Sequence, residues 1–145
     1  IGVTEELSAQ DIYELGQEIE PFAIASGTRM GHVHLSVKNS RESSAFYQES
    51  LDLEDKFTIP HASWIASGDY HHHLAVNEWG GKNLAPREQG MAGLAYYVVE
   101  VENKEELLKV FAQSQSANSI TQWLSSAEFS LTDKDGIVTR VRVES

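Results

Sequence analysis

Histidines are the residues of this chain best suited to chemistry. Five of the six lie in two short segments, Gly31–Val37 (GHVHLSV) and Tyr70–Asn77 (YHHHLAVN), and His61 follows Pro60 in a predicted surface loop. Neutral imidazole is the commonest metal ligand, and two or three imidazoles with a carboxylate suit Zn, Fe(II), Ni or Mn. The two segments therefore predict a metal site, against the ordinary alternative of half-buried polar residues in strands.

Strand periodicity predicts which way the histidines of the first segment point. Val33 and Leu35 alternate with His32 and His34, which is typical of a half-buried strand. The apolar residues should face a helix, so His32 and His34 are expected on the opposite, concave face.

The same argument applies to the second segment. Leu74 and Val76 mark its apolar side. Strand alternation then predicts that His71 and His73 share the concave face with the first two histidines, whereas His72 faces the helix. Four imidazoles would thus meet in one concavity.

The elements that position these residues occur twice in the order strand, helix and three strands. The first copy starts at Gly31 and the second at Gly93, and each has an Asn followed three residues later by Glu, which is typical of a helix N-terminus. The expected short strands are 55–59, 63–66 and 71–76, then 120–124, 128–131 and 137–143. This repeat predicts an α+β fold in which two βαβββ modules form a cupped mixed sheet.

The chain is predicted to divide into an N-terminal segment and one main domain. Residues 1–28 are expected to form a helix, over 7–20 with Ser8 as its N-cap, and a linker. The main domain would cover 29–145. Its modules are expected at 29–80 and 92–145.

Composition excludes several classes of function. The absence of cysteine excludes disulfides, Cys-zinc sites and thiol catalysis and favours a cytoplasmic location. A net charge of −11 argues against nucleic-acid binding, and no apolar run is long enough to span a membrane. The chain starts with Ile1 and has no signal-peptide pattern, so we expect a piece of a longer protein.

Several motifs carry a family resemblance that extends over residues 28–145. Gly31–Val37 followed by Ala45–Glu54 resembles the opening of the vicinal oxygen chelate superfamily, which comprises glyoxalases, bleomycin-resistance proteins and extradiol dioxygenases. Tyr70–Trp79 resembles in particular the C-terminal domain of two-domain catechol 2,3-dioxygenase-like proteins, and Gly27–His32 fits the linker before it. The resemblance implies two βαβββ modules whose cup holds a divalent metal.

The resemblance also implies roles for four histidines. The first-strand metal ligand falls on His32 and the fourth-strand ligand on His73. His34 or His71 would be an additional ligand or a catalytic base. The expected cofactor is a divalent ion, namely Fe, Mn, Zn or Ni.

The second module departs from the family pattern. Leu94 stands where the family has a histidine, and Arg140 stands where it has a glutamate. A cation repels a metal ion, and extradiol cleavage needs two histidines and one carboxylate. Tyr96 and Arg140 are instead predicted to bind substrate in the cup, against the alternative of an arginine on a solvated strand edge.

Three functional hypotheses follow. The leading one is the C-terminal domain of a glyoxalase or catechol 2,3-dioxygenase-like protein, a degenerate metal cup that supports metal-dependent chemistry on small molecules with vicinal oxygens. The second is an independent metal-dependent dioxygenase or isomerase. The third is a metal-free binding module of the bleomycin-resistance type, with Tyr96, Trp79 and Arg140 in the cup. The expected partner is an N-terminal domain of the same chain or a homodimer mate.

Overall fold

The chain forms two units, Ile1–Met30 and Gly31–Ser145. The computed structural model describes residues 6–16, 23–81, 84–85, 88, 90–117 and 119–144. In the first unit, α1 (Ala9–Leu15) begins after Ser8, whose side chain accepts a hydrogen bond from the N–H of Asp11. The predicted N-cap is therefore confirmed, whereas residues 17–20 of the predicted helix lie outside the described residues.

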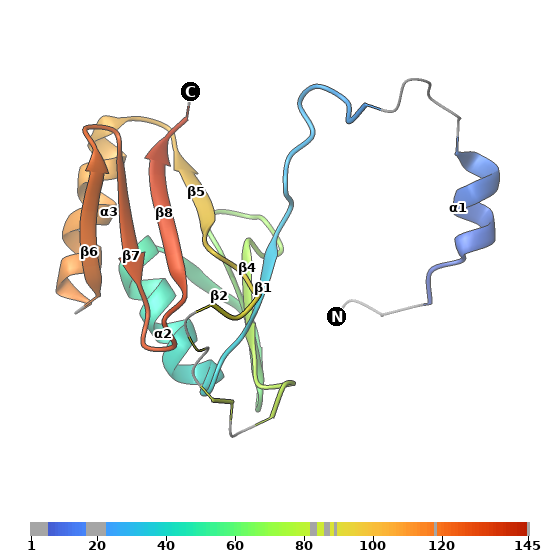
Figure 1. The fold of residues 1–145 in the computed structure, drawn as a ribbon, viewed down its shortest axis with the longest axis horizontal. Helices are drawn as coiled ribbons and strands as arrows, with labels where there is room; N and C mark the ends of the chain where they lie inside the picture. The colour runs from blue at the N-terminus through green and yellow to red at the C-terminus, as the bar shows by residue number, and fades with distance from the viewer. Residues whose placement is uncertain are drawn as a thin grey trace. The chain divides into compact units, whose positions relative to one another are not determined.

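The second unit contains two copies of one arrangement (Figure 1). The first copy consists of β1 (Val33–Ser36), α2 (Ser40–Leu51), β2 (Glu54–Ile59), β3 (Ala62–Ala66) and β4 (Leu74–Asn77). The second consists of β5 (Tyr97–Val101), α3 (Lys104–Ser116), β6 (Ile120–Ser125), β7 (Glu128–Thr132) and β8 (Val138–Val143). The predicted α+β fold of two βαβββ modules is confirmed. In the described parts of the chain, no helix has the length and hydropathy of a membrane span.

Each module forms its own four-stranded mixed sheet. The strand order is β1-β4-β3-β2 in the first sheet and β5-β8-β7-β6 in the second. In each sheet the first and last strands of the module are parallel, and the remaining pairs are antiparallel. Between the described strands of the two sheets there is no pairing, so two separate sheets stand in place of one continuous sheet.

Side-chain caps fix where the two long helices begin. Asn39 accepts a hydrogen bond from the N–H of Glu42, as predicted for the N-cap. The return bond differs from that of a capping box, because the Glu42 carboxylate accepts from the side-chain amide of Asn39 and not from its backbone N–H. Glu78, which follows β4, accepts hydrogen bonds from both the N–H and the hydroxyl of Ser40. Asn103 caps α3 in the same way, through the N–H of the third helical residue. The cap positions predicted from sequence are confirmed.

One hydrophobic core holds the two modules together. It lies on the helix side of both sheets, where α2 also packs against α3. Its largest fully buried side chains come from both modules and include Tyr47, Ile65, Leu107, Phe129 and Leu131. Because the apolar residues of both sheets point toward the helices, the opposite face of each sheet is left open; we call these the open faces.

Polar contacts strengthen the junction between the modules. The buried hydroxyl of Tyr47 on α2 donates a 2.7 Å hydrogen bond to Asp133, in the turn between β7 and β8. The other carboxylate oxygen of Asp133 accepts two backbone N–H groups of that turn. On α3, the hydroxyl of Ser114 donates to the carbonyl of Ser50 at 3.0 Å. Burial raises the pKa of Tyr47, so its hydroxyl remains a donor at neutral pH.

Tyr47→Phe is expected to lower the free energy of unfolding by about 1–3 kcal/mol, because a buried carboxylate oxygen of Asp133 loses its donor. Urea denaturation measures this change. The control is Tyr13→Phe, at a residue that is 80% exposed, which should stay within about 0.5 kcal/mol of the wild type. Equal unfolding midpoints for the two variants would contradict the role of this hydrogen bond.

Candidate metal and ligand site

Four histidine side chains gather where β1 and β4 begin; we call them the imidazole cluster. They are His32, His34, His71 and His72. The ring centroids of His32 and His72 lie 4.3 Å apart, and the Nε2 atoms of His34 and His72 lie 3.2 Å apart. One ligand atom from each of His32, His71 and His72 lies within 4.8 Å of the other two. These three residues can therefore hold one metal ion.

The position of His72 differs from the prediction that it faces the helix. Regular pairing in β4 begins only at Leu74, so strand alternation does not govern residues 71–73. His72 consequently lies beside His32 in the cluster. Sequence reasoning missed this candidate ligand, although the Ser67-Gly68 dipeptide, a typical turn signal, indicated that the strand starts late.

The ring of His73 is held elsewhere. Its Nδ1 accepts a hydrogen bond from the N–H of Ser67 at 3.2 Å, and its ring centroid lies 4.7 Å from that of Tyr70. The structure thus gathers His32 with His71 and His72, without His73. Metal ligation by His73 stays a prediction.

Burial favours the neutral form of two imidazoles of the cluster, His34 and His72. Burial lowers the pKa of His72 to about 4, and the neighbouring rings of His32 and His71 contribute to the same shift. Burial and then His32 lower the pKa of His34. Neutral imidazole is the form that binds a metal, so His34 and His72 are ready to ligate at pH 7.

Among the residues that the structure describes, the second module supplies no carboxylate to this cluster. Arg140 forms an ion pair with Glu128, with 3.5 Å between Nη1 and Oε1, and its guanidinium lies 3.8 Å over the ring of Tyr96. The two predicted substrate-binding residues are therefore brought together on the open face of the second sheet. The described group of ligand side chains contains imidazoles alone. Such a set fits zinc or another divalent ion that accepts nitrogen ligands, and it does not fit the two-histidine, one-carboxylate iron site.

A cleft of about 320 Å³ lies beside the cluster, between β1 and the turn that joins β7 to β8. His34 lines it from the first module, while Leu94 and Ile137 line it from the second. Its wall also carries two lysines and one carboxylate, Lys38, Lys134 and Asp135. Ligand pockets typically measure about 300–1,000 Å³, so this cleft can accept a small molecule next to His34.

Sequence comparisons identify relatives of the chain. A family model described as the Glyoxalase/Bleomycin resistance protein/Dioxygenase superfamily matches residues 29–141. A catechol-2,3-dioxygenase from Bacillus subtilis (strain 168) is 36% identical over 87 residues, which are 59% of this chain and 30% of that protein. The match therefore spans less than a third of that relative's length.

Solved structures share the fold. The fosfomycin resistance protein FosX from Listeria monocytogenes has a TM-score of 0.58 at 14% identity, covering 84% of this chain and 96% of that one. Lactoylglutathione lyase from Agrobacterium tumefaciens has a TM-score of 0.59 at 13% identity, with coverages of 82% and 96%. A glyoxylase/bleomycin resistance protein/dioxygenase domain from Frankia sp. EAN1pec has a TM-score of 0.60 at 20% identity, with coverages of 83% and 100%. At these identities the likeness concerns the fold, and together with the matching family model it places this chain in the glyoxalase, bleomycin resistance protein and dioxygenase superfamily.

Proposed function

We propose that this chain is one domain of a catechol 2,3-dioxygenase-like protein, and that its imidazole cluster holds a divalent metal ion for a substrate with adjacent oxygens. The observation that carries the proposal is the approach of His32, His71 and His72, whose ligand atoms lie within 4.8 Å of one another. The name of the 36% identical relative, a catechol-2,3-dioxygenase, supports the substrate class.

The residues of the first module divide into two roles. His32, His71 and His72 would hold the ion, which when bound acts as a Lewis acid toward a substrate oxygen. Within the cluster, His34 contacts His72, and it also lines the cleft. It is therefore placed to accept a proton from a hydroxyl bound there, and its lowered pKa keeps it in the basic form.

Oxygen-dependent ring cleavage is assigned to another domain of the same protein. That reaction uses two histidines and a carboxylate with open coordination positions, and Arg140 stands where the carboxylate is expected. The ion pair of Arg140 with Glu128 supports this assignment, because the carboxylate of Glu128 is engaged by Arg140. The limited share of the catechol-2,3-dioxygenase that the match covers leaves room for a further catalytic domain.

The proposal includes a partner for the open faces. Trp79 on the first module and Tyr96 on the second are 64% and 43% exposed. An N-terminal domain of the same protein, or a second copy, would cover part of this surface. Light scattering of the purified chain distinguishes the two, because only self-association raises its molar mass above that of the monomer.

A metal-free binding domain of the bleomycin-resistance type is the second candidate. The stack of Arg140 on Tyr96 favours it, because a guanidinium over a ring offers a planar anion both charge and a contact surface. In this case ligand binding would be insensitive to chelators.

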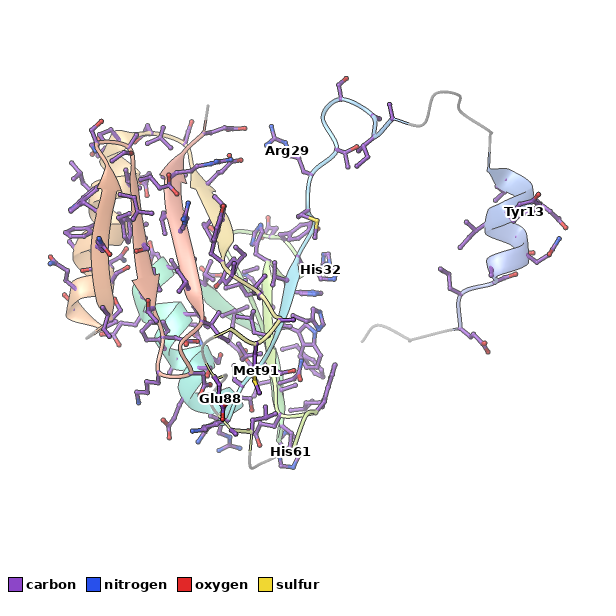
Figure 2. All side chains as sticks on the ribbon, viewed as in Figure 1. Tyr13, Arg29, His32, His61, Glu88 and Met91 are labelled. Atoms are coloured by element: carbon purple, nitrogen blue, oxygen red, sulfur yellow. The ribbon has the colours of Figure 1, made fainter. Side chains whose placement is uncertain are left out.

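Elemental analysis of protein that has never touched a nickel column tests the metal site. We expect about one equivalent of zinc or another divalent ion in the wild type, and its loss in His32→Ala and in His72→Ala. His61→Ala is the matched control, because His61 is exposed at the opposite end of the first sheet (Figure 2) and pairs with Glu78. Wild-type protein that stays metal-free after zinc, Fe(II) and Mn(II) are supplied would contradict the proposal.

The metal-free protein is expected to lose stability as the pH falls from about 6.5 to about 4. In this range the unfolded chain protonates His72 at its ordinary pKa of 6.5, whereas the folded chain does so only near pKa 4. Protons therefore favour unfolding there. Urea denaturation at several pH values measures the slope, which His72→Gln should reduce. Parallel profiles for the two proteins would show that the imidazole is not shifted.

A further inference from the structure

A row of ring side chains crosses the open face of the first sheet. In the strand pairing, His34 stands opposite Ala75, and Ala75 stands opposite Trp64. Trp64 in turn stands opposite Phe57. Trp79 bridges the small alanine, since its ring centroid lies 6.3 Å from that of His34 and 6.4 Å from that of Trp64. We call the four ring side chains the aromatic row.

A β-bulge turns Phe57 onto this face. The register between β2 and β3 shifts between Asp55 and Phe57, which leaves Lys56 as the extra residue. With uninterrupted pairing, Phe57 would stand opposite Ser63, whose hydroxyl points to the helix side and bonds to Ser44 of α2. The bulge instead leaves Phe57 51% exposed, at a ring centroid distance of 5.4 Å from Trp64. An exposed ring gathered into a row indicates a binding surface.

The row begins at the imidazole cluster and ends at Phe57, next to the ion pair of Lys56 with Glu54. His34 belongs to both the row and the cluster, since its Nε2 lies 3.2 Å from that of His72. Neighbouring strands are about 4.8 Å apart, so a row across four strands spans about 14 Å. That length exceeds a single benzene ring and accommodates two or three fused or linked rings.

The row is too small to be an interface for a second copy by itself. A stable interface buries about 800 Å² on each partner. Trp79 and Phe57 are 64% and 51% exposed and Trp64 is partly buried, so the three side chains together supply about 300 Å². The area and the contact with the cluster both fit a planar small molecule better.

We infer that the aromatic row binds the rings of an extended aromatic substrate, of two or more rings, whose adjacent oxygens point toward the imidazole cluster. The position of the substrate's adjacent oxygens at the imidazole cluster rests on the proposed function. The preference for additional rings depends on Trp79, Trp64 and Phe57 alone and is independent of the metal.

Calorimetric titration with catechol and with 2,3-dihydroxynaphthalene tests this inference in both metal-free and zinc-loaded protein. The two-ring diol is expected to bind about tenfold tighter than catechol in both forms. Trp64→Ala and Trp79→Ala should each weaken the two-ring diol about three- to tenfold and leave catechol nearly unchanged, whereas Phe57, at the far end of the row, lies beyond the reach of two rings. Ile120→Ala is the matched control, an exposed apolar residue of β6 in the other sheet, and should change neither affinity.

Several results would overturn the inference. Equal affinities for the one-ring and two-ring diols would do so, as would unchanged binding in Trp64→Ala and Trp79→Ala. A change of molar mass in those variants, without a change of ring preference, would assign the row to a protein partner. If zinc neither binds nor raises the affinity for either diol while the ring preference persists, the proposed metal site fails and the aromatic row stands.

Discussion

The packing of α2 against α3 determines which surfaces of this molecule are available for chemistry. Apolar residues of both sheets are used in the shared core on the helix side, and the buried bond from Tyr47 to Asp133 locks one module to the turn of the other. The shared core therefore does not depend on the residues of the open faces. Imidazoles, aromatic rings and paired charges can occupy them without weakening the core.

The two open faces have diverged although the modules share one architecture. On the second sheet, Arg142 contacts Glu100 at 2.8 Å and Arg140 contacts Glu128, so cross-strand ion pairs cover the surface. On the first sheet, aromatic rings and imidazoles stand beside a single ion pair, that of Lys56 with Glu54, among the described contacts of that sheet. Over the second face each of these arginines is balanced by a glutamate, whereas the first face offers nitrogen lone pairs to a metal ion. The repeated fold therefore supplies one face with imidazole nitrogens that can ligate a metal and one face covered by balanced charges.

Sequence predicted the features that depend on local patterns. The alternation around Leu35 and the caps at Asn39 and Asn103 are each set by neighbouring residues, and the structure confirms them. His72 and Phe57 were beyond such reasoning, because the face of a strand residue reverses when pairing starts later or gains one residue. Both events depend on the partner strands, through the late start of β4 and the shift between β2 and β3.

The bulge at Lys56 also bears on how the molecule avoids aggregation. β2 is an outer strand of the first sheet, and an outer strand with unpaired backbone groups invites pairing with another chain. A bulge twists such an edge, and the ion pair of Lys56 with Glu54 adds charge along it. The bulge at Lys56 therefore has two effects. It exposes the ring of Phe57, and it discourages another chain from pairing with β2.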